Sequence, residues 1–195
     1  MGNLRSVQKA FEHWGQKPLI SSKVSEIEKA DKIVLPGVGA FSQAMFELKK
    51  RKLVSALKEK IQSGTPYLGL CLGLQLLFSS SEEGREKGLG IFPGRVKKFS
   101  FRGGKLKVPH MGWNTISIKK ENSPLFEHET AGDYFYFVHS FYAVPEEKNI
   151  VASTTNYGSD FCSAVWRDNI YATQFHPEKS QRAGLRLIGN FVKSC

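Results

Sequence analysis

Residues 66–78 read Pro66-Tyr67-Leu68-Gly69-Leu70-Cys71-Leu72-Gly73-Leu74-Gln75-Leu76-Leu77-Phe78, an apolar run with one cysteine between two glycines. The residues before Cys71 suit a buried strand, and Leu74, Leu77 and Phe78 recur at helical spacing, so the run predicts a strand, a sharp turn and a helix. The glycines leave room for a strained backbone and for close packing of strand on helix. This pattern predicts a nucleophile elbow with sulfur as the nucleophile, because the start of a helix favours the thiolate. A buried structural cysteine is the alternative.

A thiolate nucleophile needs a base, and the segment Gln174-Phe175-His176-Pro177-Glu178 supplies a candidate at the end of an apolar stretch. Side chains two residues apart on an extended chain project to the same side, so Glu178 can reach one ring nitrogen of His176 while the other faces the sulfur. Pro177 keeps His176 out of the helical region. The elbow and this segment together predict a Cys71, His176 and Glu178 triad; a solvated Glu178 beside a strand-end histidine is the alternative.

These two motifs resemble the triad of the class I glutamine amidotransferases. Three further segments resemble one branch of that family, the glutaminase subunits of imidazole glycerol phosphate synthases: Leu35-Pro36-Gly37-Val38-Gly39, Pro109-His110-Met111-Gly112-Trp113-Asn114 and Tyr134-Phe135-Tyr136-Phe137-Val138-His139-Ser140. The resemblance covers essentially the whole chain. It implies hydrolysis of glutamine to glutamate and ammonia through a Cys71 thioester. It also implies transfer of the ammonia to a (βα)₈-barrel cyclase subunit in histidine biosynthesis, in a heterodimer.

The resemblance assigns further roles by position. It implies an oxyanion hole at Val38, Gly39 and Leu72, substrate contacts at Gly37, Gln75, His139, Ser140 and Phe141, and a partner interface at Trp113, Asn114, Tyr136 and Lys179. Family members usually begin with a short hydrophobic strand and an Asp-Tyr-Gly-like turn, whereas this chain starts at Met1-Gly2-Asn3. Either the start of the chain was assigned to an internal methionine, or the first strand of the sheet has been lost. Loss of a central strand would weaken the fold and hence the activity.

Three other functions remain open at this point. The same triad could supply ammonia to a different synthase, such as one that aminates a surface sugar. A cysteine peptidase acting on γ-glutamyl bonds would need no barrel partner. A truncated paralogue would bind a barrel but do no chemistry.

The composition and charge of the chain argue against several other classes of protein. The chain has 195 residues, 41% of them hydrophobic, and a formal net charge of +10. The basic clusters lack interleaved aromatics and any nucleic-acid reading motif, so we expect a lysine-rich surface and no nucleic-acid partner. No apolar run is long enough for a bilayer and no signal-peptide pattern is present, which predicts a cytoplasmic location. The three cysteines have no paired spacing, and the histidines and cysteines lack ligand spacing, so we expect no disulfide framework, metal or cofactor.

The rest of the chain predicts one domain over residues 1–195. Helices are expected at 4–14, 24–30, 41–63 and 181–192, and strands at 17–21, 32–35 and 65–70. Short β segments follow at 95–101, 105–108, 115–119, 134–138, 150–155, 161–166 and 170–175, with turns at 102–105 and 167–169. Alternation of strand and helix in the first half favours a three-layer α/β sandwich, with a mostly parallel central sheet flanked by helices and a smaller antiparallel β portion.

Overall fold

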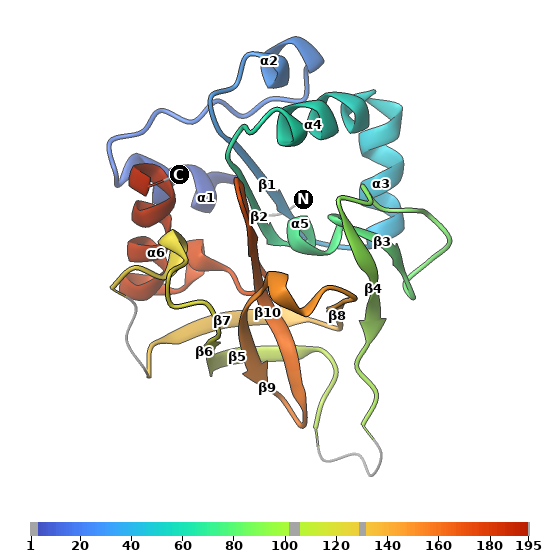
Figure 1. Ribbon diagram of the computed structural model, residues 1–195, viewed down its shortest axis with the longest axis vertical. Coiled ribbons are helices and arrows are strands. Elements are labelled where there is room, and N and C mark those ends of the chain that lie inside the picture. Colours follow the sequence, from blue (N-terminus) through green and yellow to red (C-terminus); the bar gives the residue numbers. More distant parts are fainter. Residues whose placement is uncertain (1–3, 102–105, 129–131, 195) are drawn as a thin grey trace.

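Strand β2 (Tyr67–Cys71) lies between β1 (Ile33–Gly37) and β11 (Ile170–Thr173), and the three strands run parallel. They form the centre of a computed structural model that describes residues 4–101, 106–128 and 132–194 (Figure 1). The register places Gly37 beside Cys71 and Thr173 beside Leu70. The carboxyl ends of the three strands therefore meet at one edge, where α/β proteins build their sites.

Beyond β11 the same sheet continues by antiparallel pairing through β10, β8 and β4, and the edge strand β3 is parallel to β4. The strand order is β1-β2-β11-β10-β8-β4-β3, with β9 on β10 and β6 on β9, and β5 pairs with β7 in a separate two-stranded sheet. The bounds of these strands are β3 (Phe78–Ser81), β4 (Phe92–Lys98), β5 (His110–Thr115), β6 (Ser117–Ile118), β7 (Tyr134–His139), β8 (Phe141–Pro145), β9 (Val151–Asn156) and β10 (Asp160–Arg167). The expected α/β class is confirmed, and the antiparallel part extends the central sheet as well as forming a ribbon of its own.

Helices cover both faces of the parallel strands, α1 (Leu4–Glu12) and α6 (Gln181–Ser194) on one side and α2 (Val24–Glu28), α3 (Phe41–Lys50) and α4 (Leu53–Gln62) on the other (Figure 1). Two hydrophobic clusters fill the spaces between these layers. Leu68 and Leu70 of β2 belong to the cluster with α1 and α6, whereas Tyr67 belongs to the cluster with α3 and α4. The strand is buried on both faces, as the apolar run predicts. Short helical turns complete the fold: α5 (Leu72–Gln75), η1 (Pro124–Phe126), η2 (Lys148–Ile150) and η3 (Pro177–Lys179).

Several predicted elements were wrong. Residues 17–21 form no strand, and Leu19 and Ile20 are 73% and 52% exposed. The helix expected over 41–63 is two helices, because Lys52 adopts a left-handed conformation with φ of 57°. The helix after Cys71 ends at Gln75 and Phe78 begins β3, while residues 106–108 form no strand.

Other predictions are confirmed or lie outside the described ranges. Asp168, at φ 51°, is in the turn that joins β10 and β11 into the expected hairpin. The expected turn at 102–105 lies outside the described residues. Among the described residues, no helix combines the length and the apolar character that crossing a bilayer requires.

Candidate active site

Cys71 is on a strained turn between β2 and α5. Its backbone adopts φ 53° and ψ −101°, which an L-residue rarely adopts and which costs on the order of 1–3 kcal/mol. The neighbouring glycines make the turn possible, because a Cβ on Gly73 would lie 1.9 Å from the Leu35 carbonyl oxygen and one on Gly69 would lie 2.7 Å from the Gly73 backbone. The buried Tyr67 hydroxyl donates a hydrogen bond to the Gly73 carbonyl at 3.0 Å, which ties the first helical turn after Cys71 to the start of β2. The predicted elbow is present.

His176 and Glu178 follow β11, the strand next to β2. His176 Nδ1 and Glu178 Oε1 are 2.8 Å apart, and both side chains are almost fully buried. The His176 backbone N–H donates to the Tyr136 carbonyl, and the Ser180 hydroxyl donates to the His176 carbonyl at 2.6 Å. The histidine is therefore held from both sides, with a carboxylate on one ring nitrogen.

The other ring nitrogen of His176, Nε2, is buried and makes no standard hydrogen bond within the described part of the chain. Burial disfavours the imidazolium, but the Cys71 sulfur and the Glu178 carboxylate outweigh burial and raise the pKa of His176 to about 9. A histidine whose charged form is stabilised by a sulfur on one side and a carboxylate on the other can hold the proton of that sulfur. The geometry is that of a nucleophile, a base and a group that orients the base.

A cavity of about 540 Å³ opens beside Cys71. Most of the residues predicted from the resemblance line it: Val38, Gly39 and Leu72 of the predicted oxyanion hole, and Gln75, His139, Ser140 and Phe141 of the predicted substrate contacts. Gly37 is not in its wall, and a Cβ at Gly37 would lie 2.9 Å from the Leu72 Cβ. Gly37 thus gives space to Leu72 instead of facing the cavity.

Gln75 and His139 share one acceptor, the Phe141 carbonyl oxygen. Gln75 Nε2 donates to it at 2.9 Å and His139 Nδ1 lies 2.7 Å from it. Because a carbonyl oxygen only accepts, Nδ1 of His139 carries the hydrogen and Nε2 is left as an acceptor. His110 Nδ1, 3.0 Å from that Nε2, then donates to it, and Asn114 Nδ2 lies 3.3 Å from His110 Nε2. The two imidazoles form a neutral, directional pair.

Burial lowers the pKa of His139 to about 3, with the Phe141 carbonyl acting in the opposite direction, and lowers the pKa of His110 to about 4. A histidine whose pKa is lower in the folded state contributes stability that is complete above the unfolded value of about 6.5 and is lost as the pH falls. The unfolded chain binds the extra protons in this window, so acid favours unfolding.

We expect the free energy of unfolding to fall by on the order of 3 kcal/mol between pH 6.5 and 4.5. His139→Gln should flatten this slope, because glutamine does not titrate. Denaturant unfolding at several pH values measures it. His128→Gln serves as the control, since His128 is 78% exposed in its side chain. An acid slope that is unchanged in His139→Gln would contradict the assignment.

Of the predicted interface residues, Trp113, Asn114 and Tyr136 lie on the ribbon of β5 and β7, and Lys179 lies in η3. Trp113 pairs with Tyr136 across the two strands, with ring centroids 5.8 Å apart, and Lys179 Nζ lies 5.7 Å from the centre of the Tyr136 ring. Asn114 instead points toward His110 and donates to the Asn156 carbonyl at 2.9 Å. Three of the four residues thus form one group beside His176, and Asn114 belongs to the histidine pair.

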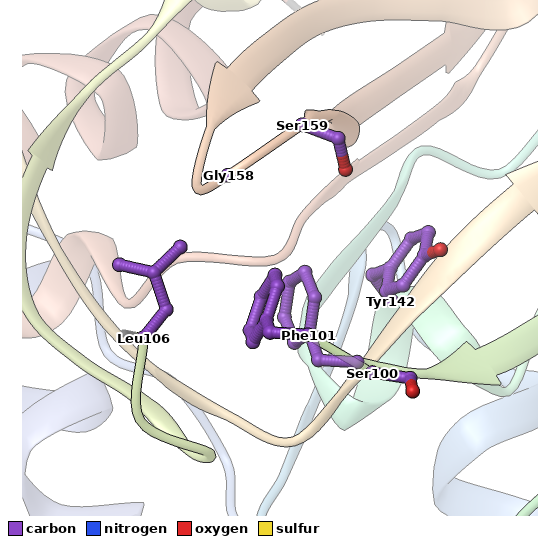
Figure 2. A pocket seen from close by; sticks show the side chains of 7 residues that line it. Ser100, Phe101, Leu106, Tyr142, Gly158 and Ser159 are labelled. Carbon is purple, nitrogen blue, oxygen red and sulfur yellow. The ribbon is translucent and has the colours of Figure 1, made fainter. Parts of the chain in front are cut away.

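A second hollow, of about 360 Å³, is separated from the triad. Phe99, Phe101, Leu106 and Tyr142 line it together with Ser100, Gly158 and Ser159 (Figure 2). Three of these seven lining residues are aromatic, and none of the seven is a nucleophile paired with a base. Within the described residues no group of histidines, cysteines and carboxylates is placed to hold a metal ion. The chemistry is therefore expected at the Cys71 cavity.

The sequence analysis assigned no individual role to three residues of the site. Gln174 Nε2 lies 3.6 Å from the Cys71 sulfur, and Glu83 is the only carboxylate among the described residues that line the Cys71 cavity. His110 was predicted only as part of a family segment. Gln174 is separated from Cys71 by 103 positions, so only the parallel pairing of β2 with β11 reveals that contact.

Comparison with known proteins agrees with this geometry. The family model "Glutamine amidotransferase class-I" matches residues 5–195. "Imidazole glycerol phosphate synthase subunit HisH" of Syntrophotalea carbinolica is 53% identical over 98% of this chain and 95% of its own length. The protein of the same name from Thermosynechococcus vestitus is 51% identical over 98% of this chain and 92% of its own.

Solved structures show the same fold at lower identity. A crystal structure of a glutamine amidotransferase superposes with a TM-score of 0.72 at 17% identity, over 96% of this chain and 95% of the other. The structure of PurLQS from Thermotoga maritima gives a TM-score of 0.70 at 16% identity, over 96% and 91% of the two chains. With the elbow, the histidine and carboxylate pair and the family match over nearly the whole length, the chain belongs to the class-I glutamine amidotransferases and, among them, to the HisH subunits of imidazole glycerol phosphate synthase.

Proposed function

We propose that this chain hydrolyses glutamine to glutamate and ammonia and passes the ammonia to a (βα)₈-barrel cyclase subunit in histidine biosynthesis. One observation carries the chemistry: Cys71, on its left-handed turn, and the His176 and Glu178 pair follow neighbouring parallel strands. The relatives with about half of their residues identical are named as imidazole glycerol phosphate synthase subunits, which supports the pathway.

The proposed reaction is acyl transfer through a thioester. His176 Nε2 takes the thiol proton of Cys71, and the thiolate attacks the side-chain amide carbon of glutamine. His176 returns the proton to the departing nitrogen, which leaves as ammonia. Water, deprotonated by the same imidazole, then attacks the thioester, and glutamate and the Cys71 thiol are released. Glu178 orients His176 and stabilises its cationic form.

Backbone N–H groups of Val38 or Gly39 and of Leu72 are proposed to bind the oxyanion. These three residues lie in the cavity wall with Cys71, and the positive φ of 95° at Gly39 permits a turn that a side chain would disfavour. Gln75, His139, Ser140 and Phe141 are proposed to contact the substrate from the other side of the cavity. Since both N–H groups of the Gln75 amide are used within the protein, its Oε1 is the atom available to glutamine.

Glu83 is suited to bind the α-ammonium group of glutamine. It lies in the cavity wall, and its Oε2 accepts the Phe41 backbone N–H at 2.5 Å, which holds the carboxylate at the start of α3. We expect Glu83→Gln to raise KM for glutamine about tenfold and to change kcat by less than about twofold, since the ammonium is remote from the reacting amide. Steady-state kinetics measure this. Glu86→Gln, at a surface ion pair with Lys49, should leave both constants unchanged; an equal effect on kcat would contradict the assignment.

The outer face of β5 and β7 is the proposed docking surface for the cyclase. The register places Met111, Trp113, Tyr134, Tyr136 and Val138 on one side of this ribbon, and Met111, Tyr134 and Trp113 are 62%, 58% and 46% exposed. Val138 also lines the Cys71 cavity. An apolar exposed face that reaches the cavity is suited to a partner that receives ammonia without release to water.

The test is glutamate release from glutamine by this chain alone, with a cognate cyclase, and with the cyclase and its nucleotide substrate. Strong stimulation by the cyclase supports the proposal. Equal turnover of γ-glutamyl peptides without any partner would favour a peptidase. Glutamine turnover that the cyclase does not stimulate would favour a different synthase.

We also propose that residues 1–195 work as a single glutaminase domain in the cytoplasm, where the other enzymes of an amino-acid pathway are expected.

A further inference from the structure

We infer that Gln174 is a further catalytic residue, which donates an N–H hydrogen bond to the Cys71 sulfur and stabilises its thiolate form. Gln174 Nε2 lies 3.6 Å from the sulfur, and the side chain is fully buried. This inference rests on the proposed thioester chemistry, because it assigns Gln174 a role only if Cys71 is the nucleophile.

The orientation of the Gln174 amide follows from its neighbours. Gln75 must direct its NH₂ group to the Phe141 carbonyl, which can only accept. The same NH₂ group is 3.0 Å from Gln174 Oε1, so Gln174 presents its oxygen to Gln75 and its nitrogen to the sulfur. With the amide turned the other way, two NH₂ groups would face each other and an oxygen would face the thiolate. The amide pair therefore fixes a donor on the nucleophile.

The backbone around Gln174 is also fixed. Its N–H donates to the Ser163 carbonyl at 2.8 Å, and the Thr173 hydroxyl donates to the Phe175 carbonyl at 3.0 Å. Gln75 is 5% exposed, so water does not readily replace either amide. A neutral donor held in a dry site stabilises a nearby anion more than it stabilises a thiol or thioester.

Gln174 and His176 thus have separate tasks at one sulfur. His176 exchanges the proton, whereas Gln174 has no proton to give up and acts only while the sulfur carries charge. The thiolate is present before attack and again when the thioester is hydrolysed, so the donor lowers the free energy of the charged sulfur at both points. A glutamine that only filled the core would have no such effect.

The experiment is the pH dependence of Cys71 alkylation by iodoacetamide in the full chain, followed by mass spectrometry of the peptide that contains Cys71. Only the thiolate reacts, so the midpoint reports how strongly the protein stabilises it. Gln174→Met keeps the length of the side chain and removes the donor. We expect its midpoint to rise by about one pH unit, and kcat/KM with the cyclase near neutral pH to fall about tenfold.

Two further variants separate this role from packing. Thr173→Val removes a neighbouring buried hydrogen bond and should lower Tm without moving the midpoint. Gln174→Glu keeps an oxygen for Gln75 and should raise the midpoint by at least as much as Gln174→Met, which provides a test if Gln174→Met does not fold. A folded Gln174→Met or Gln174→Glu with the wild-type midpoint would overturn the inference.

Failure of the proposed function gives a different result. If the wild type does not hydrolyse glutamine while the midpoint still rises in the Gln174 variants, the donor role holds and the glutaminase proposal fails. If Cys71-dependent hydrolysis is present and the midpoints agree, the glutaminase proposal holds and the role of Gln174 is wrong.

Discussion

Replacing Cys71 with alanine is expected to reduce glutamate release by about 10⁴-fold or more, because no other described residue in the cavity wall is placed to form the acyl intermediate. The fold should persist, since alanine meets the same left-handed backbone that cysteine already adopts at φ 53°. Glutaminase assays with the cyclase and its nucleotide substrate measure the loss. Circular dichroism of the same sample verifies the fold.

Cys71→Gly separates strain from chemistry at the same position. Glycine should be equally inactive but more stable than alanine by roughly 0.5–1 kcal/mol, because it adopts positive φ without a Cβ clash and the gain exceeds its larger loss of backbone entropy. Thermal unfolding of the two variants measures this difference. Residual, cyclase-stimulated turnover in either variant would exclude Cys71 as the nucleophile, whereas a less stable glycine variant would argue against strain at the elbow.

Gly73→Ala is expected to cost more than about 4 kcal/mol of folding free energy. Gly73 is in α5, where helix propensity alone would favour alanine by about 1 kcal/mol. The added Cβ would lie 1.9 Å from the Leu35 carbonyl oxygen, which is backbone of β1 and cannot rotate away. Either β1 shifts or the elbow opens, and both move Cys71 away from His176. Soluble yield, Tm and glutaminase activity should fall together.

The matched control is Gly64→Ala. Gly64 has φ of 89° but open space around its Cα, so alanine there meets backbone strain of about 1 kcal/mol and no clash. A Gly73→Ala protein with a Tm close to that of Gly64→Ala would show that close packing of β1 on the elbow does not limit the fold.

The sequence predicts the parts of the site that depend on local chemistry. Glycines on both sides of Cys71 are needed for one turn, and His176 is two residues from Glu178, so both motifs can be identified from a few neighbouring residues. The paired imidazoles of His110 and His139 depend on the register of β5 against β7, which no local pattern determines. The contact of Gln174 with Cys71 likewise depends on strand order.

The errors in the predicted secondary structure have similar causes. Nothing in the sequence around Lys52 marks a left-handed residue, so one helical pattern over 41–63 concealed a break into α3 and α4. Leu19 and Ile20 suit a strand by composition, yet a strand also needs a neighbour to pair with, and the structure pairs this segment with none of the described strands.

His139 stays neutral across the pH range of a living cell, because its pKa lies near 3, and it forms part of the cavity wall. This neutrality affects what happens to the ammonia after it is released. Ammonia is a nucleophile only as the free base, and a charged imidazole in the wall would convert it to ammonium and hold it there. The neutral imidazole of His139 gives no proton to the departing nitrogen, so the nitrogen keeps its lone pair where it passes this part of the wall, in the form that a second reaction can consume.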